Sequence, residues 1–317
     1  MTDTLVLDEE QRTDKFNELV ARLSHQSVVK HFDAYADVAW DDPEFLIDPA
    51  DPRFELAGDS GLGATEWYRN QPPEVRARIG LHSITANMKA GLQFESILKR
   101  GLLEYAFRLP DHSPEFRYAY HEVIEEAQHS LMFQEFVNRS GLDVPGLTWD
   151  LKIGSRRVIS MGRYFPELFF VFVLGGEDPI DHVQRTALRS GRDLHPLLER
   201  IMRIHVTEEA RHLSFARQYL RTNVPLLSRW RRAAIAIEAP IILSVMAAVM
   251  MRPPRTLVRE YGIPKPVIAE AYGKGSPARD DTRVSLRKVR GLLTELGLVN
   301  PISKRLWQAL GIWEENA

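Results

Sequence analysis

The amino-acid sequence predicts an all-α protein in which a four-helix bundle forms the core and additional helices flank it. Three observations lead to this prediction. Apolar residues recur at helical spacing along most of the chain, and the alternating pattern of strands is scarce. Glycine and proline divide the chain into long segments. Two of these segments repeat one short motif that a helical bundle uses.

The composition is that of a globular protein and excludes several functional classes. The chain has 317 residues, 44% apolar and 26% charged, which is enough for one large domain or two ordinary ones. We find no linker long enough to separate two domains and predict one domain over residues 1–317. The formal net charge of −2 does not suggest a nucleic-acid-binding protein. Without cysteine, any metal must be held by oxygen and nitrogen ligands.

The first half of the chain is expected to contain three helices and one long ordered loop. The loop is rich in Pro, Asp and Gly, and the third helix is stopped by Ser140-Gly141. The expected helices cover residues 8–24, 74–108 and 114–138, and the loop covers residues 41–63.

The second half is expected to contain longer helices followed by short ones. A helix over residues 155–174 is expected to be interrupted at Gly175-Gly176, and Pro179 suits the start of a new helix. Two long helices are expected over residues 196–222 and 226–251. Short helices over residues 255–312 are broken by Pro264 and by a loop that starts at Gly275. The bundle core is thus expected at about 77–222, and C-terminal helices at 226–312.

One apolar stretch has nearly the length of a membrane span. Residues 233–251 are mostly apolar, and a spanning helix needs about 20 such residues. Glu238 and Pro240 lie inside the stretch, and a glutamate is costly in lipid, so we predict a buried core helix and no membrane. The N-terminal sequence is acidic and polar and lacks the regions of a signal peptide, so we predict a cytoplasmic protein.

The repeated motif reads Glu-Glu-Ala-x-His and occurs at residues 125–129 and 208–212. Glu95 lies 31 residues before Glu126, and Glu177 lies 32 residues before Glu209. Two antiparallel helices joined by a short turn bring such a pair to one height. A Glu and a His three residues apart share one helix face. Two such hairpins supply four carboxylates and two histidines, which is how a ferritin-like bundle holds two metal ions.

The helix faces that carry these glutamates are apolar, and glutamates on such faces are rare unless they are paired or bound to metal. The alternative is a structural bundle with buried ion pairs, for which Arg211 and Lys99 are the available partners. Buried ion pairs add little net stability, so we favour the metal site. His205 lies four residues before Glu209 on the same face and is a candidate seventh ligand.

Further residues are expected around the ligands. Metal-bound histidines usually donate their second N–H to a carboxylate or carbonyl, so we suggest that Glu125 orients His212 and Glu208 orients His129. The alternative, which we rate equally, is that both are solvated helix charges. Glu122 can be a substitute ligand or a supporting group. Residues near the ligands in sequence can line a substrate pocket, although plain core packing is the better interpretation: Phe94, Met132, Phe133, Leu174 and Phe215.

From about residue 80 to 220 the chain resembles the para-aminobenzoate N-oxygenase family of non-haem di-iron enzymes. That family holds its metals with a glutamate, a Glu-x-x-His, a second glutamate and a His-x-x-x-Glu-x-x-His. The pattern is complete here, and the additional histidine sets it apart from most ferritin-like di-iron proteins. The resemblance implies these metal ligands: Glu95, Glu126, His129, Glu177, His205, Glu209 and His212.

The resemblance also implies a function. It implies two iron ions per chain, activation of O2, oxidation of an amine nitrogen on a small and possibly aromatic substrate, and a homodimer. Manganese or a mixed Mn/Fe centre suits the same ligands. Because the sequence has no flavin or nicotinamide motif, an external electron donor such as a ferredoxin or a flavoprotein reductase is expected.

Two other functions use similar ligands. A ferroxidase or metal-binding ferritin-like protein without an organic substrate is the main alternative, although such chains are about half this length. A radical-generating subunit usually has a tyrosine one turn after the first motif histidine, where this chain has Phe133.

Overall fold

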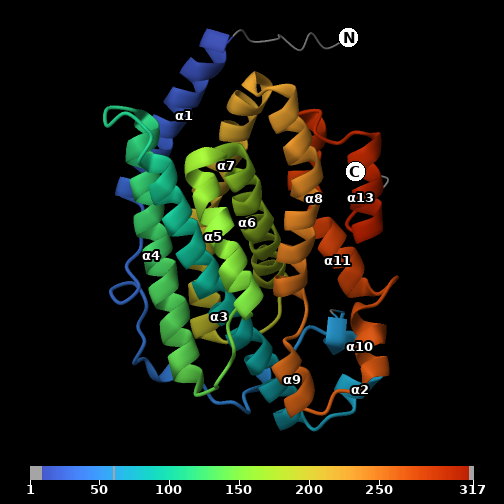
Figure 1. Cartoon of the computed structure of the whole chain (residues 1–317). Helices are drawn as coiled ribbons and strands as arrows, with labels where there is room; N and C mark the ends of the chain where they lie inside the picture. The colour runs from blue at the N-terminus through green and yellow to red at the C-terminus, as the bar shows by residue number, and fades with distance from the viewer. Residues whose placement is uncertain (1–8, 60, 314–317) are drawn as a thin grey trace.

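The computed structural model describes residues 9–59 and 61–313, and within these residues it contains helices and no strand. The predicted all-α fold is confirmed. Four long helices form the bundle and lie side by side at the centre of the molecule (Figure 1). These helices are α3 (Pro73–Ala106), α4 (Pro114–Ser140), α6 (Pro166–Arg189) and α7 (Pro196–Asn223).

The bundle consists of two helical hairpins. Helices α3 and α4 pack against each other, as do α6 and α7, and contacts from α3 to α6 and from α4 to α7 join the pairs. Local signals set the ends of α4. The Ser113 side chain accepts a hydrogen bond from the Phe116 N–H at the start, and Gly141 adopts a φ of +67° at the end. The predicted helix boundaries agree with the structure within about two residues for these three elements: α3, α4 and α7.

The other helices surround the bundle. Helix α1 (Glu9–Val29) packs on α4 and α7, α5 (Trp149–Tyr164) packs on α3 and α6, and α8 (Arg229–Met251) packs on α6. Short helices follow α8 and lie beside it in Figure 1. They are α9 (Arg255–Glu260), α10 (Lys265–Tyr272), α11 (Pro277–Ser285), α12 (Arg287–Glu295) and α13 (Pro301–Leu310).

The predicted helix break at Gly175-Gly176 is wrong. The chain breaks at Phe165, before Pro166, and α6 then continues through both glycines and Pro179. A residue that precedes proline disfavours the α conformation, which explains the earlier break. The glycines serve packing instead: a Cβ on Gly175 would lie 2.7 Å from Leu243 Cδ2 of α8. They allow α8 to approach α6 closely.

Helix α8 is the one described helix that is long and apolar enough to cross a membrane by length and composition. One of its faces, which includes Ile235 and Leu243, is buried in the main hydrophobic core, whereas Ile241 and Val245 on another face are exposed. In total, 44% of its apolar window is buried. Helix α8 thus packs one face on the bundle and leaves an apolar face at the surface, so it is less buried than the core helix expected from the sequence.

The segment between α1 and α3 covers one face of the bundle. It contains short turns and one short helix: η1 (Pro43–Phe45), η2 (Pro52–Phe54), η3 (Gly61–Ala64) and α2 (Glu66–Arg69). Trp40 and Phe54 are buried in a hydrophobic cluster with Phe136 of α4 and Ile201 of α7. Apolar packing around Phe54 therefore orders part of the long loop predicted at 41–63, of which residue 60 lies outside the described residues.

Candidate metal centre

The seven residues named as metal ligands come together inside the bundle. Each of the four bundle helices contributes at least one of them, and each of the seven residues is at most 7% exposed. The helical hairpins bring the two glutamates of each pair to one height, as their spacing suggested. The contributions are Glu95 from α3, Glu126 and His129 from α4, Glu177 from α6, and His205, Glu209 and His212 from α7.

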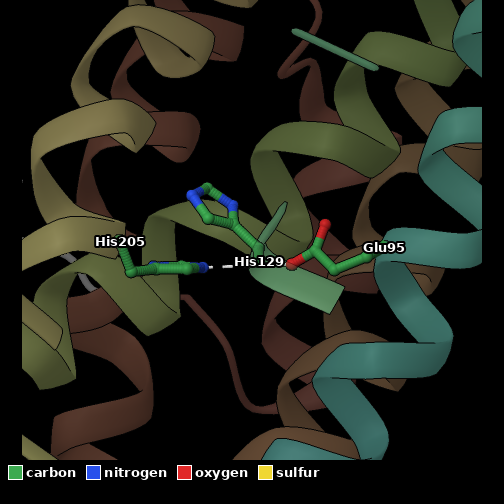
Figure 2. Close-up of side chains that lie close together, drawn as sticks. All are labelled: Glu95, His129 and His205. Atoms are coloured by element: carbon green, nitrogen blue, oxygen red, sulfur yellow. Dashed lines mark ion pairs between the residues drawn. The ribbon is translucent and has the colours of Figure 1, made fainter. Parts of the chain in front are cut away.

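The seven side chains form two adjacent groups, and within each group the potential ligand atoms lie within 4.8 Å of one another. The nitrogen-rich group consists of Glu95, His129 and His205. Figure 2 shows this group, with the His205 ring directed towards the Glu95 carboxylate; His205 Nε2 and Glu95 Oε1 are 3.9 Å apart. The carboxylate-rich group consists of Glu126, Glu177, Glu209 and His212.

Two carboxylates of the carboxylate-rich group also face the nitrogen-rich group. Glu126 Oε1 lies 2.9 Å from His212 Nδ1, while its Oε2 lies 3.1 Å from His129 Nδ1. Glu209 Oε1 lies within 3.5 Å of a ring nitrogen of all three histidines. Glu126 and Glu209 therefore each face both groups, and each would be able to reach a metal ion held in either one.

Each of the three histidines has its outer nitrogen fixed by an oxygen acceptor. His212 Nε2 lies 2.7 Å from Glu125 Oε2, and His129 Nε2 lies 2.9 Å from Glu208 Oε2. These are the crossed pairs that we expected from the sequence. His205 Nδ1 lies 2.9 Å from Gln184 Oε1. An outer N–H that donates to such an acceptor leaves the inner nitrogen of each ring directed at the cluster.

The orienting carboxylates are themselves held by further contacts. Arg211 Nη2 lies 2.8 Å from Glu125 Oε1 and 3.4 Å from Glu208 Oε1. The backbone N–H of Phe32, in the segment after α1, donates to Glu208 Oε1 at 3.2 Å. Glu125 and Glu208 are 2% exposed or less, so they are not solvated helix charges.

The basic residues near the cluster do not neutralise the candidate ligands. Arg211 pairs with the orienting carboxylates, and Lys99 Nζ donates to the Glu126 main-chain carbonyl at 3.0 Å and to the Ser130 hydroxyl. Among the described residues, no Lys or Arg forms an ion pair with any of the seven candidate ligands. Lys and Arg side chains therefore leave these carboxylates without an ion-pair partner, and their charge must be balanced by protons on the cluster or by a metal ion.

The protonation of the metal-free cluster reflects its excess of carboxylates. Burial, with nearby carboxylates, raises the pKa of Glu95 and of Glu177 well above its usual range. Burial alone would lower the pKa of His129, but hydrogen bonds to Glu126 and Glu208 raise it to about 10. Burial lowers the pKa of His205 to about 4. Protons therefore supply part of the positive charge that the buried carboxylates require.

The donor set fits a metal ion on structural grounds. Both carboxylate oxygens of Glu177 and of Glu209 are buried without a hydrogen-bond partner. His212 Nδ1 and Glu126 Oε1 are close, yet neither makes a hydrogen bond of acceptable geometry. Buried polar groups normally make hydrogen bonds. A cluster of buried nitrogen and oxygen atoms without hydrogen-bond partners is therefore the pattern expected of side chains that bind a metal ion.

Two further polar residues lie near the centre. Gln184 was missed in the sequence analysis, and Glu122 was named there only as a substitute ligand or a supporting group. Gln184, which contacts His205, lies seven residues after Glu177 on the same face of α6, and this spacing was the available signal. Glu122 is fully buried, both of its oxygens lack a hydrogen-bond partner, and burial raises its pKa to about 8. It lies one turn before Glu126 on α4.

The suggested pocket residues are mostly core. Met132, Leu174 and Phe215 are fully buried in the hydrophobic clusters, and Phe94 is half-buried beside Phe172. Phe133 is the exception, because its ring centroid lies 5.4 Å from that of His205 and 6.4 Å from that of His129. Phe133 thus forms an apolar wall of the nitrogen-rich group.

The chain is similar in sequence to mycobacterial proteins over most of its length. The uncharacterized protein Rv0885 of Mycobacterium tuberculosis (strain ATCC 25618 / H37Rv) is 42% identical over 294 residues, which cover 93% of this chain and 86% of the relative. The uncharacterized protein Mb0909 of Mycobacterium bovis shows the same identity and coverage. No solved structure matches the chain significantly.

A family model described as P-aminobenzoate N-oxygenase AurF matches residues 13–297. The match spans most of the chain and extends well beyond the 80–220 region in which the motif resemblance was found. It includes all four bundle helices, the segment that covers them and most of the C-terminal helices. The chain therefore belongs to the p-aminobenzoate N-oxygenase AurF family of di-iron oxygenases.

Proposed function

We propose that this protein is a di-iron oxygenase that uses O2 to oxidise the amine nitrogen of a small aryl amine. One observation carries the proposal: the two adjacent ligand groups, completed by His205, lie buried in the bundle of a chain that belongs to this family. The seven residues Glu95, Glu126, His129, Glu177, His205, Glu209 and His212 are the proposed ligands. Manganese in one or both positions suits the same donors.

Two iron ions held by these residues would supply the redox chemistry that reduces O2. The protein residues have separate tasks. Glu126 and Glu209 hold the two positions together, since each faces both groups. Glu125, Glu208 and Gln184 keep the inner nitrogens of the histidines available by accepting hydrogen bonds from the outer ones. Phe133 and the buried apolar residues around it exclude water from the centre.

The reaction requires electrons from outside the protein. One amine, one O2, two electrons and two protons give one hydroxylamine and one water, so that one oxygen atom enters a new N–O bond and the other leaves as water. We propose that a ferredoxin or a flavoprotein reductase supplies the electrons. We also propose a homodimer in the cytoplasm, which sedimentation analysis and fractionation would test.

The proposal is tested with purified protein loaded with iron. Iron content per chain is measured first, and the protein is then incubated with a panel of aryl amines, a chemical reductant and O2. We expect about two iron ions per chain and a product heavier by one oxygen atom, with the label when 18O2 is used. Glu209→Ala is expected to abolish the product. Glu199→Ala serves as the matched control because Glu199 lies on α7 in a surface ion pair with Arg203.

The same experiment separates the main alternative function. A ferroxidase would take up many iron ions per chain in cycles of O2 consumption and would leave every amine unchanged. A folded, helical protein that retains no iron would contradict both functions and would leave a structural bundle.

A further inference from the structure

An open cleft lies at the end of the molecule formed by the short C-terminal helices. It has a volume of about 660 Å³ and is bounded by the end of α8, by α9 and α10, and by the start of α11. Binding sites for small molecules commonly have volumes of about 300–1,000 Å³. Helices α9 and α10 lie together at the lower right of Figure 1, away from the middle of the bundle.

Four basic side chains line the cleft, and no acidic residue does: Arg252, Arg255, Lys274 and Arg279. None of the four forms an ion pair within the described part of the chain. Elsewhere on the same helices such pairs are present, for example between Arg283 and Asp280 at 2.5 Å. Unpaired guanidinium groups in a concave site suit a bidentate anion.

The positive charges in the cleft repel one another. Arg279 Nη2 donates to the Leu310 main-chain carbonyl at 2.9 Å, which fixes its position without neutralising it. Burial, followed by the charges of Arg252 and Arg283, lowers the pKa of Arg279. A bound anion would relieve this repulsion.

The charge asymmetry extends beyond the cleft. Residues 252–279, which supply the lining of the cleft, contain six basic and two acidic residues, a formal charge of +4 in a chain whose net charge is −2. The rest of the chain therefore carries a formal charge of −6. Such a separation attracts anions to this end of the molecule and repels them from the remainder.

The remaining surface of the cleft is apolar and ordered. Val258, Ile268 and Tyr272 line it and pack against a small hydrophobic core. The Tyr272 hydroxyl accepts a hydrogen bond from the Leu62 N–H at 3.3 Å. An aromatic ring and aliphatic side chains beside four cations suit a ligand that has an apolar body as well as negative charge.

We propose that this cleft binds a phosphorylated small molecule with a flat apolar body, the chemical class of nucleoside phosphates. The phosphate oxygens accept hydrogen bonds from the four basic side chains, and the ring lies against Tyr272 and Ile268. The concave shape favours a small molecule over a protein surface. The site does not depend on the proposed oxygenase function, because it shares no residue with the metal centre.

The cleft is also distant from the metal centre. The small core beside it contains Ile79 of α3, and Glu95 lies 16 residues further along the same helix. At 1.5 Å per residue, the two levels are separated by about 24 Å along the helix axis. A ligand in the cleft would therefore not contact the metal ligands.

Calorimetric titration of the iron-loaded protein at low salt tests the proposal, with ADP, pyrophosphate, inorganic phosphate and adenosine as probes. We expect ADP to bind more tightly than inorganic phosphate and adenosine not to bind measurably. The double variant Arg255→Gln/Lys274→Gln is expected to weaken ADP binding about tenfold or more. The matched control is Arg259→Gln/Lys265→Gln, which removes two exposed charges from α9 and α10 that do not line the cleft.

Four outcomes would overturn the proposal. The first is no binding of ADP or pyrophosphate at millimolar concentration. The second is equal weakening in both double variants, which would reflect net charge alone. The third is binding unaffected by either variant, which would place the ligand outside the cleft. Vesicles that contain an anionic phospholipid serve as a fifth probe, and the fourth outcome is binding to these vesicles alone, which would indicate a membrane surface rather than a small molecule.

Discussion

The two ligand groups of the candidate centre lie side by side but differ in charge. The nitrogen-rich group has one carboxylate and two imidazoles, whereas the carboxylate-rich group has three carboxylates and one imidazole. With neutral imidazoles the formal charges are −1 and −3. The two groups therefore need a cation to different extents. In the nitrogen-rich group, hydrogen bonds to the imidazole rings hold the side chains in place. In the carboxylate-rich group, the negative charges repel one another until a cation or protons compensate them.

Removing a carboxylate that both groups share should have the largest effect. Glu126→Ala takes away donor atoms that face His129 and His212 at once, so we expect iron to fall from about two ions per chain to almost none. Metal analysis after iron-supplemented expression measures this, with Glu199→Ala as control. If Glu126→Ala retained one ion per chain, Glu126 would belong to a single group and the two groups would be independent.

Removing an orienting carboxylate should lower metal binding less than removing a shared carboxylate does. Each orienting carboxylate should affect only the group whose histidine it contacts. Glu208→Gln acts through His129 in the nitrogen-rich group, and Glu125→Gln acts through His212 in the carboxylate-rich group. Loss of such an outer partner typically lowers metal affinity about 10–100-fold. Competition with a chelator during metal release should show one ion leaving earlier in each variant. Release of both ions at the wild-type rate would mean that these hydrogen bonds do not orient the ligands.

The charge imbalance itself can be tested in the metal-free protein. Glu177→Gln keeps the volume of the side chain and removes a buried carboxyl group whose oxygens lack partners. We expect the free energy of unfolding of the metal-free protein to rise by about 1 kcal/mol, and urea denaturation measures this. Glu95→Gln, in the less charged group, should raise it by a smaller amount. Equal increases in the free energy of unfolding for the two variants would show that charge repulsion destabilises both groups to the same extent.

Acid should affect the groups in different pH ranges. The pKa of His205 is lowered from 6.5 to about 4 by burial, so its neutral form stabilises the metal-free fold above pH 6.5, and this contribution is lost as the pH falls through 4. Burial alone would raise the pKa of Glu125, but its bonds to His212 and Arg211 lower it from 4.5 to about 2. Its contribution is therefore present above pH 4.5 and lost as the pH falls through 2.

A series of urea denaturation curves from pH 7 to pH 2 separates the two contributions. His205→Gln should flatten the loss of stability between about pH 6.5 and 4, and Glu125→Gln should flatten it between about pH 4.5 and 2. If both variants flattened the loss of stability in the same pH range, the result would contradict separate titration of His205 and Glu125.

The clustering of the seven candidate ligands could be predicted from the sequence because these residues follow helical spacing. The repeated Glu-Glu-Ala-x-His motif fixes which residues share a face, and the 31- and 32-residue separations fix which faces meet. Gln184 was missed because an amide seven residues from Glu177 has no distinctive chemistry until His205 is placed beside it. The helix break at Gly175-Gly176 was wrong because glycine marks both a helix end and a close helix contact, and only the position of Leu243 decides between them.

The basic cleft could not be predicted for a related reason. Its basic residues have no regular spacing. They come from the end of α8, from α9, from the turn after α10 and from α11: Arg252, Arg255, Lys274 and Arg279. The sequence shows only that the region is basic. The concave shape results from the way these segments pack on the small core near the start of α3.

The hydrogen bond from the Phe32 backbone to Glu208 bears on how this protein can be shortened. Helices α3 to α7 contain every proposed ligand, which makes residues 73–223 look like a natural minimal fragment. Yet Phe32 donates to Glu208, and the Ala34 N–H donates to the Gln128 side chain at 2.9 Å, beside His129. A fragment that begins at Pro73 would lose both donors and expose Phe136 and Ile201 to water. The smallest unit able to hold the proposed ligands in place thus begins before Phe32, and libraries for directed evolution should keep that segment intact.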